Sequence, residues 1–174
     1  VETIVQGLYD KLVGETVVEC ATTQKKLRAD SYAFLEENIV DSKFEHLYRR
    51  GKYIVAELSS GNSLLIHLGM SGKLTVKEDP EILKHDHVKL WLSNKSCLTF
   101  NDPRRFGCFV MASHQDILEN PLLKILGYEP LSNDFTPEVL EKLLKGKKTN
   151  IKTFLMNSKF IVGVGNIYAS EALF

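Results

Sequence analysis

The sequence predicts an α+β protein in which an antiparallel β-sandwich with flanking helices is followed by the start of a helical domain. Three observations support this prediction. Helical spacing of apolar residues opens the chain, short apolar runs separated by turn residues fill residues 43–113, and helical spacing returns after Pro121. The 174 residues suffice for one domain or two small ones. We expect a β-rich domain with a leading helix over residues 1–125 and the beginning of a helical domain over residues 126–174.

The first expected helix ends at Gly14, because glycine commonly follows a helix C-terminus. Its apolar positions share one face and are Val1, Ile4, Val5, Leu8 and Leu12. A short strand, T-V-V-E-C-A, follows at residues 16–21. Asp30 or Ser31 is expected to cap a second helix through Y-A-F-L-E-E-N-I-V.

The sandwich strands are expected in the apolar runs K-Y-I-V-A-E-L, S-L-L-I-H-L, H-V-K-L-W-L and C-L-T-F. Turn residues such as S-S-G-N and S-N-K-S separate them, as in a series of hairpins. In the C-terminal part, Thr136 precedes a proline and the periodic V-L-E-K-L-L, which predicts a capped helix. Further helices are expected over residues 151–160 and from near Ile167, joined by G-V-G-N.

Composition excludes several classes of protein. The formal net charge is zero, with 22 basic and 22 acidic residues, so a nucleic-acid partner has to be sought in local clusters. The cysteines, Cys20, Cys97 and Cys108, lack the spacing of a zinc site or a disulfide framework, which fits a reducing intracellular compartment. No apolar run approaches the roughly 20 residues that span a bilayer, and no signal-peptide pattern opens the chain.

A basic surface is expected in the C-terminal third, where residues 142–170 contain six lysines and no acidic residue. Glycines followed by a helix start, as in G-V-G-N, allow amide N–H groups to approach and bind a phosphate. Asn166 would be the N-cap of that helix or a direct phosphate donor. The alternatives are a solvated lysine face and a plain turn between helices.

Two other clusters admit two interpretations each. R-R-G-K, residues 49–52, either protects a strand edge from aggregation or uses Lys52 to bind a phosphate. In K-H-D-H-V, His85 and His87 stand at i, i+2 on one face of a strand and could begin a metal site, but no third ligand is apparent.

An aromatic and two arginines stand at an expected turn in N-D-P-R-R-F-G-C-F, residues 101–109. Arg104, Arg105 and Phe106 would project from the turn that Asp102-Pro103 starts, beside Met70 of I-H-L-G-M-S-G if the two turns are neighbours. Apolar wedges and arginine that replace an extruded base are what a base-flipping protein needs. The alternative is a phenylalanine that folds back onto the sheet and two exposed arginines.

Together these strings resemble the formamidopyrimidine-DNA glycosylase family of bacterial base-excision repair. Eight segments match its pattern in order: V-E-T-I-V, R-R-G-K-Y, I-H-L-G-M-S-G, K-H-D-H-V, N-D-P-R-R-F-G, L-G-Y-E-P-L-S, I-K-T-F-L-M and G-V-G-N-I-Y-A-S-E-A-L-F. The related endonuclease VIII branch shares the fold but lacks several of these strings, so it is the alternative assignment.

The resemblance implies a β-sandwich followed by a helix-two-turn-helix domain and a zinc finger, with duplex DNA bound in a cleft. The family removes oxidised purines such as 8-oxoguanine and formamidopyrimidines, and then cleaves the abasic strand by β- and δ-elimination. By resemblance, Met70, Arg104 and Phe106 would fill the gap left by the extruded base. The residues that would hold phosphates are Lys52, His67, Lys152 and Asn166, with Arg105 as a further backbone contact. Lys52 is also a candidate for a supporting catalytic role.

The chain departs from the family pattern at both ends. The family begins Pro-Glu-Leu-Pro-Glu immediately before V-E-T, and its N-terminal proline amine and the following glutamate perform catalysis. An N-terminal amine has a pKa of about 8 against about 10.4 for lysine, so far more of it is neutral at pH 7. Val1 would lie several residues from the position of that amine, and Glu2 matches a later glutamate.

We therefore expect a glycosylase truncated at both ends, without the zinc finger, and inactive as these 174 residues. No cofactor is expected within them. The remaining alternatives are a non-catalytic module that binds damaged DNA and an RNA-binding protein that shares the G-V-G-N element. The family further implies a full-length monomer in the bacterial cytoplasm, associated with the nucleoid.

Overall fold

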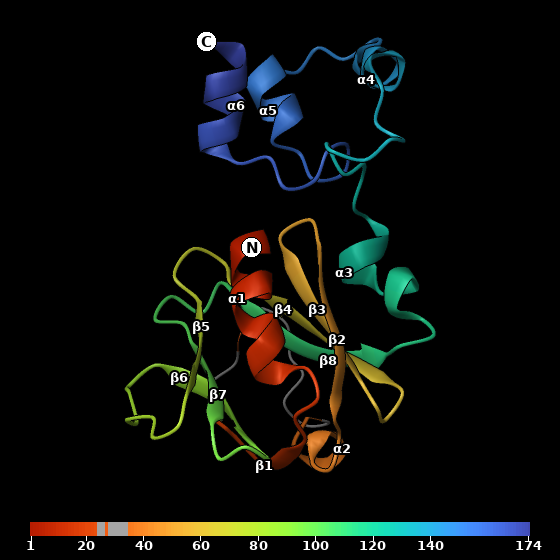
Figure 1. The fold of residues 1–174 in the computed structure, drawn as a ribbon. Coiled ribbons are helices and arrows are strands. Elements are labelled where there is room, and N and C mark those ends of the chain that lie inside the picture. The colour runs from red at the N-terminus through yellow and green to blue at the C-terminus, as the bar shows by residue number, and fades with distance from the viewer. Residues whose placement is uncertain (24–26, 28–34) are drawn as a thin grey trace. The chain divides into compact units, whose positions relative to one another are not determined.

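The computed structural model describes residues 1–23, 27 and 35–174 (Figure 1). The chain forms two compact units. Unit 1 contains Val1–Arg49 and Tyr53–Ile117, and unit 2 contains Arg50–Lys52 and Leu118–Phe174. In chain order the elements are α1 (Glu2–Leu12), β1 (Val17–Thr22), α2 (Leu35–Ile39), β2 (Phe44–Arg50), β3 (Tyr53–Leu58), β4 (Asn62–His67), β5 (Lys73–Lys77), β6 (Asp86–Leu92), β7 (Cys97–Asn101), β8 (Cys108–Ser113), η1 (Ile117–Glu119), α3 (Pro121–Lys124), α4 (Pro137–Leu144), α5 (Ile151–Leu155) and α6 (Asn166–Leu173).

Unit 1 is a sandwich of two four-stranded sheets with the strand orders β1-β6-β7-β5 and β2-β3-β4-β8. The pairs β1–β6, β6–β7, β5–β7, β3–β4 and β4–β8 are antiparallel. Inward-facing residues of both sheets join one apolar core, in which the rings of Phe100 on β7 and Phe109 on β8 lie 5.8 Å apart. The predicted α+β class with an antiparallel sandwich is confirmed.

Helix α1 packs against this core, and Figure 1 shows it running alongside both sheets. Its buried residues are Val5, Leu8 and Leu12, and each such side chain contributes about 1.5–3 kcal/mol by leaving water. The helix ends at Leu12, and Gly14 follows with φ +93°, where it donates its N–H to the carbonyl of Phe44 over 2.8 Å. Glycine is therefore needed just after the helix, as the sequence predicts.

The second predicted helix is present as α2, but its expected cap at Asp30 or Ser31 lies outside the described residues. In unit 2, Thr136 accepts a hydrogen bond from Val139 N over 3.4 Å, and Pro137 is the first residue of α4, which confirms that predicted helix start. Among the described residues, no helix combines the length and apolar character that crossing a bilayer requires.

The prediction of a helix over residues 151–160 is wrong in its second half, because α5 ends at Leu155. The chain then leaves the helix and pairs with another segment of unit 2. Tyr128 N donates to Phe160 O, and Val162 N donates to Tyr128 O, each over 2.9 Å. The segment after α5 thus bonds the backbone around Tyr128 and does not continue the helix.

Candidate nucleic-acid interface

Two turns at one end of unit 1 lie directly against each other. The first, residues 68–72, connects β4 to β5, and the second, residues 102–107, connects β7 to β8. A Cβ atom on Gly69, which has φ +60°, would come within 2.7 Å of both Gly107 N and Phe106 C. Only glycine allows this approach, so the two turns are neighbours and carry Met70 and Phe106 on adjoining segments.

The buried carboxylate of Asp102 joins the two turns. One oxygen accepts hydrogen bonds from Ser71 Oγ over 2.5 Å and from Arg104 N over 3.3 Å. The other accepts from Gly107 N over 2.8 Å. Asp102 has no solvent-exposed surface, so these donors replace water around its charge. The carboxylate therefore holds the shape of both turns.

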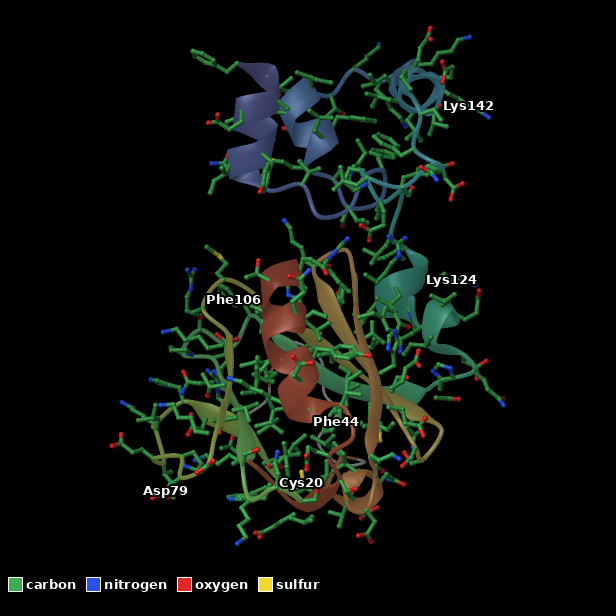
Figure 2. All side chains as sticks on the ribbon, viewed as in Figure 1. Cys20, Phe44, Asp79, Phe106, Lys124 and Lys142 are labelled. Atoms are coloured by element: carbon green, nitrogen blue, oxygen red, sulfur yellow. The ribbon has the colours of Figure 1, made fainter. Side chains whose placement is uncertain are left out.

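Three side chains of contrasting chemistry are exposed on these turns. Met70 is 74% exposed and Phe106 is 48% exposed, although both are apolar. The Arg104 guanidinium lies over the Phe106 ring, 4.8 Å from its centroid. In Figure 2, Phe106 lies on a loop, whereas Phe44 lies within the sandwich. Phe106 is not part of the apolar core, which argues against its folding back onto the sheet.

Arg105 is also exposed, but its backbone conformation is unusual. Its φ of +56° is in the left-handed region that residues other than glycine rarely adopt. Its N–H donates to Asp102 O over 3.3 Å. The contact of Arg105 with a DNA backbone stays a prediction.

His67 ends strand β4 beside the first turn. Its Nδ1 accepts a hydrogen bond from Gly69 N over 3.0 Å, and its ring packs against Tyr53 with centroids 4.9 Å apart. When Nδ1 accepts, a neutral imidazole carries its proton on Nε2. An imidazole N–H is a donor of the kind that binds a phosphate oxygen, and the phosphate contact of His67 stays a prediction.

His85 and His87 do not form the metal pair that their spacing allows. His87 is buried, its Nε2 bonds the Asp102 carbonyl over 2.9 Å, and its Nδ1 bonds Thr23 Oγ1 over 3.1 Å. His85 precedes β6, so the two histidines do not share a strand face. Across residues 1–23, 27 and 35–174, no three His, Cys, Asp or Glu side chains gather to hold a metal ion. His87 instead supports the second turn.

Asp86 fixes the strand end that leads into the second turn. It accepts hydrogen bonds from Leu83 N over 2.9 Å and from Asn101 Nδ2 over 2.8 Å, and it pairs with Lys89 Nζ at 3.2 Å. Burial raises the pKa of Asp86, but these donors and the lysine charge outweigh burial and bring its pKa below the ordinary value. The carboxylate thus stays ionised and anchors Asn101 at the end of β7.

Unit 2 gathers the other predicted phosphate ligands at the start of α6. Lys52 Nζ donates to Val164 O over 3.2 Å, immediately before that helix. Lys152 Nζ donates to Ser170 Oγ over 2.9 Å, and this hydroxyl donates to Asn166 O over 2.8 Å. The first N–H groups of a helix have no partner within it, and its N-terminus attracts anions. Two ammonium groups and a helix start therefore share one region of unit 2.

The prediction of Asn166 as the N-cap is wrong. Helix α6 begins at Asn166, and the extended Gly165 is its N-cap. Asn166 is exposed at the first helical position, so its role as a direct phosphate donor stays a prediction. In the lysine-rich stretch before α5, Lys142, Lys145 and Lys148 are exposed, and Lys147 Nζ lies 4.8 Å from the centroid of the Phe160 ring.

Several residues that organise the site were missed in the sequence. The sequence predicts Asp102 only as the start of a turn, and it predicts no functional role for Ser71, Glu129 or Asn150. The signal for Asn150 was present, because asparagine before an apolar periodic segment is typical of an N-cap. Its Oδ1 accepts hydrogen bonds from Lys152 N over 2.9 Å and from Thr153 N over 3.5 Å.

Replacing Asn150 with alanine is expected to lower the free energy of unfolding by about 1 kcal/mol, because the first N–H groups of α5 lose their acceptor. Lys152 lies in that first turn, so its ammonium should also be held less firmly. Urea unfolding monitored by circular dichroism measures the change. Replacement of the exposed Asn133 with alanine is the control, and an equal loss in both variants would contradict the cap assignment.

Comparison with known proteins finds a matching family model for each of the two units. A family model described as formamidopyrimidine-DNA glycosylase N-terminal domain matches residues 1–109, and one described as formamidopyrimidine-DNA glycosylase H2TH domain matches residues 126–174. Proteins named formamidopyrimidine-DNA glycosylase from Ruegeria pomeroyi and from Wolbachia pipientis are 41% and 42% identical to the whole chain. The chain spans 65% and 64% of their lengths.

Solved structures show the same fold with DNA present. A complex of the Lactococcus lactis enzyme with abasic-site DNA matches with a TM-score of 0.91 at 28% sequence identity, covering 99% of this chain and 64% of that one. A complex of the wild-type Lactococcus lactis enzyme with DNA containing N7-benzyl-Fapy-dG matches with the same TM-score, identity and coverage.

Proposed function

The chain belongs to the formamidopyrimidine-DNA glycosylase family, and on this premise we propose that it acts in base-excision repair of DNA. Its proposed partner is duplex DNA containing an oxidised purine or an abasic site. The proposed parent activity is removal of 8-oxoguanine and formamidopyrimidines, followed by cleavage of the abasic strand. The bacterial sources of the relatives support a bacterial cytoplasmic location.

One observation supports this function best: two apolar side chains and an arginine are exposed on turns that a buried carboxylate holds together. Extruding a base costs a few kcal/mol, which side chains that take its place in the stack must offset. Met70 and Phe106 have the apolar surface to stack between bases, and Arg104 can donate to the unpaired base opposite the gap. Rigid turns present them without a large entropy loss on binding.

The groups around the start of α6 supply the second half of the proposal. Lys52, Lys152 and Asn166 would bind phosphates of the DNA strand, with the helix N-terminus adding its dipole. His67 and Arg105 would add contacts from unit 1 to the backbone. Phosphate contacts carry no sequence information but set the position of the duplex. Met70 and Phe106, the wedge residues, would detect the missing base.

The chemical step is proposed to depend on groups that match no residue between Val1 and Phe174. The family's catalytic amine and glutamate precede the V-E-T-I-V string. We therefore propose that residues 1–174 contribute DNA recognition and that none of them supplies the attacking amine. Borohydride reduction in the presence of abasic-site DNA tests this directly, because a Schiff base would be trapped as a covalent protein–DNA adduct.

Binding can be tested apart from chemistry with a duplex that contains a stable abasic analogue. At one fixed ionic strength, the protein should bind this duplex at least about tenfold more tightly than the intact duplex, since the extrusion cost is already absent. Fluorescence anisotropy of labelled DNA measures both dissociation constants. Tighter binding to single-stranded RNA of the same sequence would instead support the RNA-binding alternative.

A further inference from the structure

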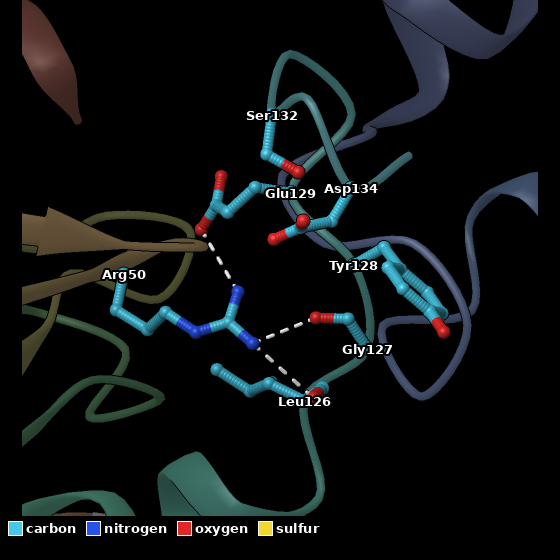
Figure 3. A pocket seen from close by; sticks show the side chains of 7 residues that line it. All are labelled: Arg50, Leu126, Gly127, Tyr128, Glu129, Ser132 and Asp134. Atoms are coloured by element: carbon cyan, nitrogen blue, oxygen red, sulfur yellow. Dashed lines mark hydrogen bonds and ion pairs between the residues drawn. The ribbon is translucent and has the colours of Figure 1, made fainter. Parts of the chain in front are cut away.

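The carboxylate of Glu129 is one of the groups that attach the turn carrying Lys52 to the rest of unit 2. Its Oε1 accepts hydrogen bonds from Gly51 N over 2.7 Å and from Arg50 Nη1 over 3.0 Å. Arg50 Nη2 in turn donates to the carbonyls of Gly127 over 2.7 Å and Leu126 over 3.2 Å. Figure 3 shows the Arg50 guanidinium directed at these three partners.

Gly51 allows this turn to sit closely on unit 2. Its φ is +57°, and a Cβ there would lie 3.2 Å from Val162 Cβ and 3.6 Å from Leu126 Cδ1. Val162 N bonds the carbonyl of Tyr128, the residue before Glu129. The segment that holds the turn is therefore hydrogen-bonded to the residues that lead into G-V-G-N.

These contacts make a continuous path from Glu129 to the start of α6. Glu129 fixes Gly51, Gly51 precedes Lys52, and Lys52 Nζ reaches the carbonyl of Val164, two residues before α6. Lysine has a long and flexible side chain, so its placement depends on how firmly its backbone is held. We propose that Glu129 is a positioning residue for DNA binding, which sets the backbone of Arg50–Lys52 so that the Lys52 ammonium meets a phosphate at the start of α6.

This proposal rests on the proposed function. It predicts that removing the Glu129 carboxylate weakens DNA binding, whereas charge repulsion alone predicts stronger binding. DNA repels a carboxylate, so removing the charge of Glu129 would strengthen binding if that charge acted only through space. If Glu129 positions Lys52, its removal weakens binding instead. Alanine and glutamine remove the same charge, but glutamine keeps an oxygen that can accept from Gly51 N.

The test is the salt dependence of binding to an intact duplex, for the protein and its Glu129→Ala and Glu129→Gln variants. Losing one phosphate contact lowers the slope of log K against log salt by about 0.9. Glu129→Ala is expected to show this loss of slope and a roughly tenfold higher dissociation constant at low salt. Glu129→Gln should lie between the protein and Glu129→Ala, and adding Lys52→Ala to Glu129→Ala should have little further effect.

Glu138→Ala is the matched control, because Glu138 is an exposed carboxylate of the same unit and its removal changes the net charge equally. Unchanged or tighter binding by Glu129→Ala, or weaker binding with an unchanged slope, would overturn the proposal. If Glu129→Ala does not fold, as judged by its melting curve, the slope of Glu129→Gln decides. Because an intact duplex is used, the result does not depend on any preference for damaged DNA. A protein without a preference for the abasic duplex would count against the proposed function and not against this proposal.

Discussion

Replacing Asp102 with alanine is expected to lower the free energy of unfolding by about 2–4 kcal/mol. It should also remove the preference for the abasic duplex over the intact duplex. The carboxylate accepts hydrogen bonds from Ser71 Oγ, Arg104 N and Gly107 N, and it has no exposed surface. Its removal leaves the buried Gly107 N without its acceptor and frees the two turns that carry Met70 and Phe106. Thermal unfolding and the anisotropy titrations described above measure the two effects.

A double-mutant cycle shows whether Asp102 affects DNA binding by joining the two turns or only by stabilising the fold. Ser71→Ala removes the partner of Asp102 on the first turn, so its effect on the abasic preference should be largely absent in an Asp102→Ala background. Asp79→Ala is the control, because Asp79 is an exposed carboxylate of the same unit. Full additivity, or an unchanged abasic preference in a folded Asp102→Ala protein, would contradict the role assigned to this carboxylate.

Replacing both Met70 and Phe106 with alanine should reduce binding to the abasic duplex by about 100-fold or more and change binding to the intact duplex little. Stacking of a side chain on a base contributes about 1–3 kcal/mol, and here two such side chains are removed. The free energy of unfolding should change by less than about 1 kcal/mol, because both side chains are exposed. Parallel titrations and melting curves measure these quantities.

Ile82→Ala is the matched control for the wedge. Ile82 is 89% exposed and belongs to unit 1, but it lies between β5 and β6 and not on either wedge turn. Its replacement removes exposed apolar surface without touching the proposed stack. If the double variant still prefers the abasic duplex, then Met70 and Phe106 do not fill a gap in DNA.

Local patterns in the sequence were sufficient for most of the fold. Apolar runs with turn residues between them predicted the sandwich strands, and Thr136-Pro137 predicted the start of α4. The wedge was also visible, because a methionine between glycines and a phenylalanine after two arginines are unusual in turns. These features depend on neighbouring residues, which a single sequence displays.

Features that depend on distant partners were not predictable. The helical pattern of residues 151–160 gives no sign that Phe160 and Val162 bond the backbone of Tyr128, which ends α5 early. His87 shows the same limit: a histidine in a strand suggests a metal ligand until its contacts with Thr23 and the Asp102 carbonyl are known. The partners of Asp102 and Glu129 likewise come from segments far from them in the chain.

The central claim, that Phe106 enters the DNA stack where a base is missing, can be tested most directly with a Phe106→Trp variant. The protein contains one tryptophan, Trp91, so the unsubstituted protein supplies the background signal. Tryptophan fluorescence is quenched when the indole stacks on a base. At saturating DNA, we predict strong additional quenching by the abasic duplex and little by the intact duplex. Equal quenching by both duplexes, or none by either, would contradict the claim.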